Sequence, residues 1–290
     1  MNDMLAGLCS RCGLGEIKTA PTPVSGGLLH RMFRVETSRG VYAVKVLNPE
    51  VMARPTALRN MRMGEAAALA FAHRVPVCAA VDAAVHELDG AYFIIYPWVE
   101  GKSVFPPQIT PEHCRIMGDV LGRIHTSGIR VAGMEKETTL RPPFDWPRGD
   151  DRLRQWDRHT LAALEKLQGR QVISHRDLDP KNVLWQGMTP CIIDWEAAGY
   201  VNPWQEMIEM LNYWAADEPM ARAMLDAYGQ HADLAAVPWT EAIQAGMDGM
   251  LGWLHYSMNR PGGEEQVRVT MKELEGYQAR ARLLLQWLKG

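Results

Sequence analysis

The sequence predicts an α+β fold in which a small β-rich N-terminal lobe with one main helix precedes a larger helical lobe. Short strand-like runs joined by tight turns fill the first hundred residues, whereas the pattern is mainly helical from about residue 102 onward. The chain has 290 residues, of which 47% are hydrophobic. This length suffices for two modest lobes, and this composition suffices for a full core without disulfides.

The N-terminal lobe is predicted from two strand pairs and one helix. The turn Ser38-Arg39-Gly40 joins the first pair into a hairpin, and the second pair surrounds Asp89-Gly90. Residues 56–74 are rich in Ala, Met, Leu and Arg and indicate a helix. Pro55 is tolerated at its start because the first helical N–H has no internal partner. The strand-like runs are residues 32–37, 41–47, 79–85 and 91–98.

The C-terminal lobe is predicted to be helical with a short β interlude. Thr110 is an N-cap followed by the first-turn proline Pro111, and this helix should run to His125. The strand-to-helix crossing at residues 96–101 is the natural boundary, so the predicted domains are 1–98 and 99–290. Further helices are expected at 148–167 and 264–288, and short strands at 172–174, 183–185 and 192–193.

Composition restricts the partners and the compartment that we expect. The net charge of −3 gives no reason to expect nucleic acid. The five scattered cysteines suit a reducing cytoplasm, and the single C-x-x-C of Cys9 and Cys12 lacks the further ligands of a zinc site nearby. No signal sequence or membrane-spanning stretch is apparent. We therefore expect a cytoplasmic monomer or homodimer with no membrane partner.

The chemistry is carried by one run of residues, 173–196. Its first part is Ile173-Ser174-His175-Arg176-Asp177-Leu178-Asp179-Pro180-Lys181-Asn182, and Ile192-Ile193-Asp194-Trp195-Glu196 follows. Phosphoryl transfer requires an oriented acceptor hydroxyl whose proton a carboxylate accepts, and Mg²⁺ held by hard oxygen ligands. Asp177 and Asn182 on one tight loop, with Asp194 after a short strand, can supply both. The alternative is that Asp177 and Asp194 only cap turns.

The run matches the protein-kinase pattern H-R-D-L-x-x-x-N. Over roughly residues 20–260 the chain resembles the kinase-like group that includes aminoglycoside phosphotransferases and choline kinases. The resemblance implies a two-lobed protein-kinase-like fold that binds ATP or GTP with Mg²⁺. It also implies that Asp177 and Asn182 are catalytic, with Asp177 as the base, and that Asn182 and Asp194 bind the metal.

Upstream residues follow in the order that this group requires. Val41-Tyr42-Ala43-Val44-Lys45 resembles the strand whose lysine contacts the α- and β-phosphates. A buried lysine needs a carboxylate partner, and Glu65 in the next helix suits that ion pair, although Glu50 competes. Gly26 and Gly27 would let backbone N–H groups approach a phosphate, or form a simple turn. The adenine is expected at the crossing segment, on the Tyr96 carbonyl and the Trp98 N–H.

The acceptor is expected to be a small hydroxyl-bearing molecule. Only eight residues separate Asp194 from Asn202, and no A-P-E signature follows, which disfavours a peptide acceptor. Residues 200–290 hold 12 acidic and 7 basic residues, so an acidic cleft would suit an aminoglycoside-like antibiotic. Aromatic residues in the same lobe leave choline or ethanolamine open through cation–π contacts, as well as sugars. A non-catalytic nucleotide-binding regulator is the alternative of another class, and the full set of motif residues disfavours it.

Several residues in this region carry two interpretations. Asp179 either adds negative charge near the acceptor or metal, or pairs with a neighbouring loop segment, and the role of Lys181 is open in the same way. Asn202 and Glu206 depart from the aspartates usual after the metal motif. The acidic residues considered for the cleft are Glu206, Glu209, Asp217, Glu218 and Asp248.

Overall fold

A computed structural model describes residues 2–24, 30–82, 84–136 and 140–289. The chain divides into two compact units. The first combines residues 1–104 with 129–134 and 175–199, and the second holds 105–128, 135–174 and 200–290. The segment with the motif residues Asp177, Asn182 and Asp194 therefore lies in the same unit as Lys45. The domain boundary after residue 98 stays a prediction.

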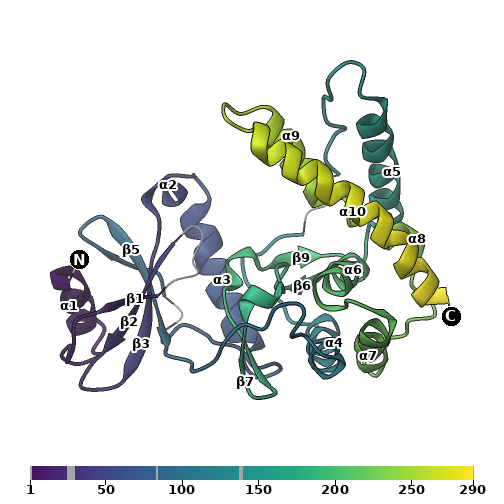
Figure 1. The fold of residues 1–290 in the computed structure, drawn as a ribbon. Helices are drawn as coiled ribbons and strands as arrows, with labels where there is room; N and C mark the ends of the chain where they lie inside the picture. The colour runs from purple at the N-terminus through teal and green to yellow at the C-terminus, as the bar shows by residue number, and fades with distance from the viewer. Residues whose placement is uncertain (1, 25–29, 83, 137–139, 290) are drawn as a thin grey trace. The chain divides into compact units, whose positions relative to one another are not determined.

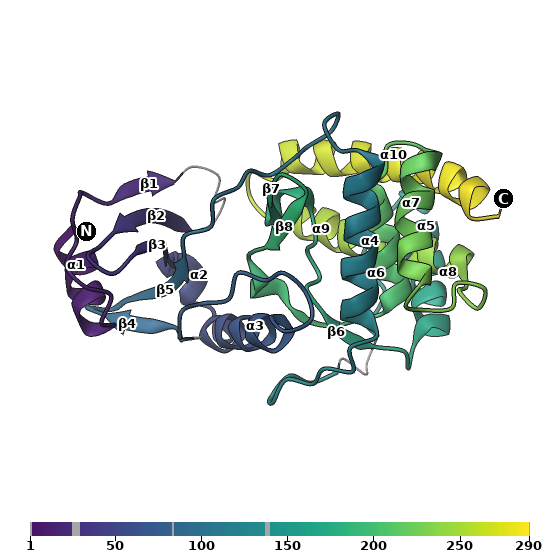
Figure 2. The same cartoon turned by 90° about the horizontal axis from the view of Figure 1, so that it is seen from below.

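A five-stranded antiparallel sheet forms the centre of the first unit (Figures 1 and 2). The strand order is β1-β2-β3-β5-β4, and the predicted hairpin around Ser38-Arg39-Gly40 forms within it as β2 and β3. In the central pair Lys45 lies opposite Ile94, and Ala43 lies opposite Tyr96. The strands are β1 (Thr22–Val24), β2 (Arg31–Glu36), β3 (Val41–Val46), β4 (His86–Leu88) and β5 (Ala91–Pro97).

The alternation of side chains along β3 gives the sheet two different faces. Val44 and Val46 pack on the N-terminal helix α1 (Asn2–Arg11), whose Leu5 and Leu8 are fully buried. The opposite face carries Lys45 and packs near α2 (Pro49–Met52) and α3 (Ala57–Phe71). One face is therefore a closed apolar core, and the other face holds the buried lysine.

The second predicted strand pair is shorter than expected. The pairing partner of β5 is β4, whereas residues 79–82 and 84–85 are not in a strand. The run 79–85 is rich in alanine, which is a poor strand former, and Asp82 accepts a hydrogen bond from the Ala84 N–H in a local turn. The tendency of Asp82 to form this turn therefore outweighs the tendency of the apolar residues in the run to form a strand.

The first unit also contains the segment 175–199. It consists of a hairpin flanked by two short 3₁₀ turns, and Gly187 with φ of 60° makes the hairpin turn. Its elements are η1 (Pro180–Asn182), β7 (Val183–Gln186), β8 (Thr189–Ile192) and η2 (Trp195–Ala197). A backbone hydrogen bond from Cys78 to Ile192 attaches this hairpin to the segment that precedes β4.

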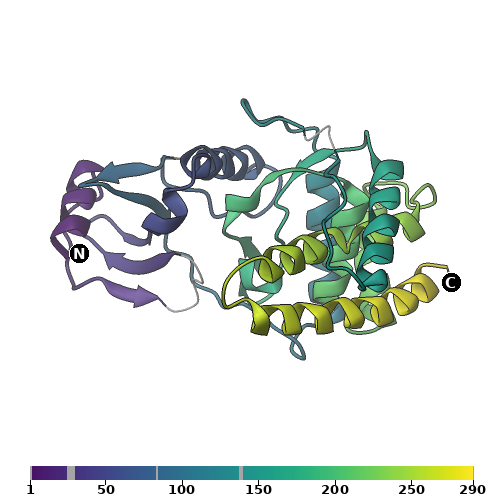
Figure 3. The same cartoon turned by 90° about the horizontal axis from the view of Figure 1, so that it is seen from above.

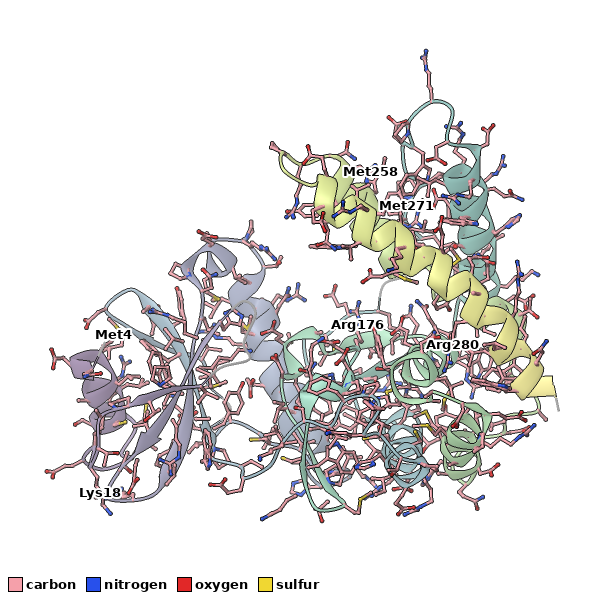
Figure 4. All side chains as sticks on the ribbon, viewed as in Figure 1. Met4, Lys18, Arg176, Met258, Met271 and Arg280 are labelled. Atoms are coloured by element: carbon pink, nitrogen blue, oxygen red, sulfur yellow. The ribbon has the colours of Figure 1, made fainter. Side chains whose placement is uncertain are left out.

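The second unit is built mainly from helices (Figure 3). The helices α4 and α7 pack closely, and a Cβ added at Gly118 would lie 2.1 Å from the Met224 carbonyl oxygen. Met258 of α9 and Met271 of α10 pack on a second apolar cluster around Leu254 (Figure 4). The helices are α4 (Pro111–His125), α5 (Asp151–Leu167), α6 (Pro203–Trp214), α7 (Glu218–Gly229), α8 (Trp239–Ala245), α9 (Asp248–Met258) and α10 (Glu264–Lys289).

The predicted helices of this unit form with the expected signals. The Thr110 side chain accepts a hydrogen bond from the His113 N–H, which makes it the N-cap of α4. The predicted strands 172–174 and 183–185 correspond to β6 (Val172–Ser174) and β7, and β6 pairs with β9 (Gly199–Val201). Within the described part of the chain, no helix combines the length and the apolar character needed to cross a membrane.

Candidate active site

The loop that follows β6 is held by the fully buried His175. Its Nδ1 accepts a hydrogen bond from the Asp177 N–H at 3.2 Å, and its Nε2 donates to the Ile193 carbonyl at 2.9 Å. Arg176, which lies between His175 and Asp177 in the sequence, adopts a left-handed φ of 67°. A residue other than glycine adopts this conformation only under constraint from its surroundings. His175 thus fixes the backbone beside Asp177 and the backbone beside Asp194. The H-R-D motif contains this histidine, but the motif pattern alone does not assign it a role at the site.

Asp177 and Asn182 lie in direct contact, as the motif predicts. The Asn182 amide nitrogen donates to the Asp177 carbonyl at 2.8 Å and to Asp177 Oδ2 at 2.9 Å. Lys181 Nζ approaches Asp177 Oδ1 at 3.3 Å. Burial raises the pKa of Asp177, and this effect exceeds the opposing influence of Lys181, His175 and Asn182. The carboxylate is therefore oriented by its neighbours but incompletely stabilised in its charged form, which favours a group that accepts a proton.

The two interpretations of Asp179 are separated by its contacts. Asp179 Oδ1 accepts the Lys181 N–H at 2.8 Å and caps the η1 turn, while Oδ2 lies 3.8 Å from Lys181 Nζ. These contacts favour a local loop ion pair. Lys181 lies between the carboxylates of Asp177 and Asp179, so its charge reaches the candidate base directly.

Asp194 lies at the end of the β7–β8 hairpin in a left-handed conformation, with φ of 63° and ψ of 61°. The neighbouring Ile193 N–H donates to the Asn182 carbonyl at 3.0 Å. This bond brings the two candidate metal ligands, Asn182 and Asp194, into adjacent backbone segments. A strained residue at this point indicates that the fold constrains the direction of the Asp194 side chain.

Lys45 pairs with Asp194 and Glu196, which corrects the expected ion pair with Glu65. Its Nζ lies 2.8 Å from Asp194 Oδ1 and 2.6 Å from Glu196 Oε2. Burial lowers the pKa of Lys45, but the charges and hydrogen bonds of these two carboxylates exceed that effect and raise it. Lys45 therefore stays protonated, and it joins β3 to the segment that carries Asp194.

Glu65 has a different partner in this structure. It is buried in α3, and the Tyr96 hydroxyl donates to its Oε1 at 2.5 Å. Burial raises the pKa of Glu65, although the Tyr96 hydrogen bond and the charge of Lys45 partly oppose this. The pKa of Tyr96 is also raised, first by burial and then by Glu65. The ion-pair role expected of Glu65 is taken by Glu196, and a role of Glu65 toward the nucleotide stays a prediction.

Two residues near Lys45 were not assigned a role from the sequence. Glu196 ends the I-D-x-E pattern, and its burial alone would raise its pKa. Hydrogen bonds and charge from His30 and Lys45 outweigh this burial and lower the pKa to about 2. His30 Nδ1 accepts the Asn48 N–H at 2.9 Å, and its Nε2 lies 3.3 Å from Glu196 Oε2. No sequence pattern indicated His30, because its partner lies far along the chain.

The backbone at the crossing segment is oriented differently from our expectation. The Trp98 N–H already donates to the Val41 carbonyl at 3.0 Å. Since hydrogen-bonded pairs alternate along an antiparallel ladder, the backbone groups of Tyr96 and Trp98 both face β3. The Trp98 N–H is therefore already bonded to β3 in this structure, and its predicted pairing with adenine stays a prediction. The groups that face the other way belong to Pro97 and Val99. Gly26 and Gly27 lie outside the described residues.

The donors around Asp194 suit a hard divalent cation. Two carboxyl groups, on Asp194 and Glu196, face the single ammonium of Lys45. The Asn182 amide oxygen adds a neutral donor, because its nitrogen is used by Asp177. Mg²⁺ prefers such oxygen ligands, usually one or two carboxylates with phosphates and water. The residues present therefore fit the predicted metal.

The acidic residues considered for an acceptor cleft are mostly engaged elsewhere. Glu206 is buried and accepts a hydrogen bond from His125 Nε2 at 2.7 Å. Asp217 caps α7, Glu218 pairs with Arg222, and Asp248 pairs with Arg141. The expectation of an acidic cleft is not supported by these four residues. Asn202, the other departure, caps α6 and donates to the Leu167 carbonyl at 3.0 Å.

The comparison with protein families decides the class of the molecule. The profile of the phosphotransferase enzyme family matches residues 21–239. The chain belongs to this family. It is therefore a phosphotransferase, and its membership confirms the predicted class of small-molecule kinase. No curated protein matches the chain at the significance level applied.

Solved structures of low identity share the fold. The amicoumacin kinase hAmiN, in complex with AMP-PNP, Ca²⁺ and Ami, is 14% identical with a TM-score of 0.68, over 93% of this chain and 92% of that one. The macrolide 2'-phosphotransferase MphH from Brachybacterium faecium is 17% identical with a TM-score of 0.66, over 93% and 97%. The choline kinase LicA from Streptococcus pneumoniae is 14% identical with a TM-score of 0.67, over 96% and 99%. This similarity confirms the predicted α+β kinase-like fold class.

Proposed function

We propose that the protein transfers the γ-phosphate of ATP or GTP to a hydroxyl group of a small molecule, and that this molecule is an aminoglycoside-like or other antibiotic. The observation that carries the proposal is one connected network. Lys45 contacts Asp194, the Ile193 backbone next to it contacts Asn182, and Asn182 contacts Asp177. A phosphate contact, a metal ligand set and a base thus lie in one compact unit.

Asp177 accepts the acceptor's proton in this proposal. The acceptor oxygen attacks the γ-phosphorus, its proton passes to Asp177 Oδ1, and the bond from the γ-phosphorus to the bridging oxygen breaks to release the nucleoside diphosphate. Asn182 holds the carboxylate in place through Oδ2. Lys45 contributes a positive charge to the phosphates. Mg²⁺, when bound by Asn182 and Asp194, would neutralise charge on the phosphate oxygens.

Nucleotide binding is supported by similar structures, which hold AMP-PNP with Ca²⁺, GDP or AMP. We assign the adenine or guanine to the Pro97 carbonyl and the Val99 N–H, because these groups face away from β3. Val99 packs in the same apolar cluster as Ala43 and Ile193, which suits the face of a base. Tyr96 and Trp98 stay in the proposal as neighbours of this contact.

Two acceptor classes remain, and each has its own support. Proteins of similar structure include an amicoumacin kinase and phosphotransferases for spectinomycin, a macrolide and an aminoglycoside, which favours an antibiotic. A choline-like cation is the second candidate, because the exposed rings of Trp253 and Tyr256 stack at 5.4 Å and the Arg260 guanidinium lies over both. The cytoplasmic location and the monomeric or homodimeric state expected from the sequence stay predictions.

A substrate panel tests the proposed function. The purified chain is incubated with Mg²⁺ and either ATP or GTP, together with aminoglycosides, spectinomycin, macrolides, choline, ethanolamine and sugars. Mass spectrometry then detects phosphate addition to each compound. We expect one antibiotic class to be phosphorylated, whereas phosphorylation of choline or ethanolamine alone would select the second candidate. Nucleotide binding without phosphorylation of any compound would favour the non-catalytic alternative.

The Asp177→Asn variant tests the mechanism in the same assay. An amide cannot accept the proton, so we expect kcat to fall by about 10²–10⁴-fold, the usual contribution of a general base. Nucleotide affinity, measured by calorimetry, should change less than about threefold because Asp177 is not proposed to contact the nucleotide. A variant that keeps more than a tenth of the wild-type kcat would remove Asp177 from the role of base.

A further inference from the structure

A second group of metal-ligating side chains lies outside the proposed nucleotide and catalytic residues. Cys12 directly follows α1, Asp82 lies in the segment that leads into β4, and His86 is the first residue of β4. Leu88 of β4 packs against α1 near Gly7, which brings these distant parts of the sequence together. No sequence pattern indicates the site, because Asp82 and His86 are about seventy residues from Cys12. The other cysteine of the C-x-x-C motif, Cys9, is buried in the apolar core.

The distances between the three side chains fit a tetrahedral ion. Cys12 Sγ lies 3.6 Å from His86 Nδ1 and 3.8 Å from His86 Nε2. His86 Nε2 lies 2.9 Å from Asp82 Oδ2, and one ligand atom from each residue falls within 4.8 Å of the others. Zinc–ligand bonds of about 2.0 Å to nitrogen or oxygen and about 2.3 Å to sulfur place tetrahedral ligand atoms about 3.3–3.5 Å apart. The distances from His86 Nε2 to Cys12 Sγ and to Asp82 Oδ2 need adjustments of only a few tenths of an ångström, and the Cys12 and Asp82 ligand atoms lie within 4.8 Å of each other.

The donor set selects the type of metal. One thiolate, one imidazole and one carboxylate are the ligands that zinc takes, whereas Ca²⁺ and Mg²⁺ prefer oxygen ligands alone. We propose that Cys12, Asp82 and His86 bind one zinc ion, with water in the fourth position. With the thiol deprotonated and the imidazole neutral, the ligands carry two negative charges, which match the charge of the ion.

The surroundings of the three ligands support this assignment. Asp82 Oδ1 accepts the Ala84 N–H at 3.2 Å, which orients the carboxylate with Oδ2 next to His86. Arg11 donates to the Glu87 carbonyl at 2.8 Å and joins the end of α1 to β4.

Zinc at this position would connect the end of α1 to β4. None of its ligands belongs to the residues proposed for nucleotide binding or catalysis, so the expected effect is on the stability of the first unit. Binding only to the folded chain raises the unfolding temperature in proportion to the logarithm of the free zinc concentration above its dissociation constant. This thermal shift does not depend on any substrate.

Metal titration of the full chain tests the proposal. The protein is stripped with a chelator, kept reduced with a phosphine, and titrated with zinc by calorimetry, followed by thermal unfolding. Cobalt serves as a spectroscopic probe, because a thiolate ligand gives a charge-transfer band in the near ultraviolet. We expect one zinc per chain, a higher unfolding temperature with zinc, and a cobalt–thiolate band.

Substitutions identify the ligands. Cys12→Ser should abolish the cobalt–thiolate band, and Cys12→Ser, Asp82→Asn and His86→Gln should each lower zinc affinity at least about tenfold. His73→Ala, at an exposed position just after α3, is the matched control and should leave zinc binding unchanged. Absence of zinc binding by the wild-type chain would overturn the proposal. Zinc binding of wild-type strength in Cys12→Ser and His86→Gln would overturn it as well.

Discussion

Individual contacts in the motif segment explain why its residues occur in this combination. His175 hydrogen-bonds both the Asp177 backbone and the Ile193 backbone, so one imidazole fixes two candidate functional segments. The motif could be interpreted from the sequence because its residues are close together along the chain. The partner of Lys45 could not, because Asp194 and Glu196 are about 150 residues away and Glu65 offered an equally plausible carboxylate.

Lys181 should control the pH dependence of the reaction. Burial raises the pKa of Asp177, and the nearby Lys181 ammonium opposes this increase. In Lys181→Met the pKa of Asp177 should rise further, so the base becomes protonated at higher pH. We expect the acidic limb of the kcat/KM profile to move upward by on the order of half to one pH unit, a modest effect because Lys181 is half exposed.

The control for this experiment is Lys18→Met, which removes an exposed lysine that lies in the loop before β1 (Figure 4). Its pH profile should coincide with that of the wild type. An unchanged acidic limb in Lys181→Met would show that the titration of Asp177 does not govern the profile.

Lys45 and Glu65, the carboxylate expected to pair with it, are distinguished by the effect of their substitutions on nucleotide binding. Lys45→Met should raise the KM for nucleotide by about 10–100-fold, which corresponds to the loss of a hydrogen bond to a charged group. Glu65→Gln should change this KM by less than about threefold, because the Glu65 carboxyl group is bound to Tyr96 and not to Lys45. Steady-state kinetics at saturating acceptor gives both values. A Glu65→Gln variant as defective as Lys45→Met would restore the ion pair expected from the sequence.

Helices were easier to predict than strands in this chain, for a physical reason. The start of α4 carries its own local signals, the cap Thr110 and the proline Pro111. A strand depends on the neighbour with which it pairs, and that neighbour is not encoded locally. The run 79–85 therefore looked like a strand, whereas the actual partner of β5 begins at His86.

Close helix packing predicts opposite effects for two glycine substitutions. A Cβ added at Gly118 in α4 would lie 2.1 Å from the Met224 carbonyl oxygen in α7, so Gly118→Ala must push the two helices apart. We expect a loss of about 1–3 kcal/mol in the free energy of unfolding. Gly276 is exposed in α10 with nothing within 4 Å of an added Cβ, so Gly276→Ala should gain about 0.5–1 kcal/mol.

Urea unfolding followed by circular dichroism measures both variants. Equal midpoints for Gly118→Ala and the wild type would show that α4 and α7 separate without cost. A destabilised Gly276→Ala would indicate that α10 has a different environment in solution.

At the scale of the whole molecule, the charged side chains around Lys45 connect the candidate active site to the stability of the folded chain. Lys45, His30 and Glu196 come from three different parts of the sequence and meet at the segment that carries Asp194. The family and the class of chemistry follow from the sequence, because they depend on short motifs. The arrangement that stabilises the charged groups follows only from the fold.

Glu196 predicts how the stability of the protein changes with acid. Its pKa in the folded protein is about 2, below the value of about 4.3 for an unfolded chain. The charged form therefore stabilises the folded state above about pH 4.3, and this contribution is lost as the pH falls through about 2. In Glu196→Gln the contribution is absent at every pH. The wild-type urea midpoint should exceed that of the variant most at neutral pH, and the difference should shrink steadily between pH 5 and pH 2. Other carboxylates titrate in both proteins, so the difference isolates Glu196.

Glu16→Gln, at an exposed position, should instead follow the wild-type curve over the whole range. If the wild type and Glu196→Gln keep a constant difference in midpoint down to pH 2, the ion pair between Lys45 and Glu196 does not stabilise the folded chain.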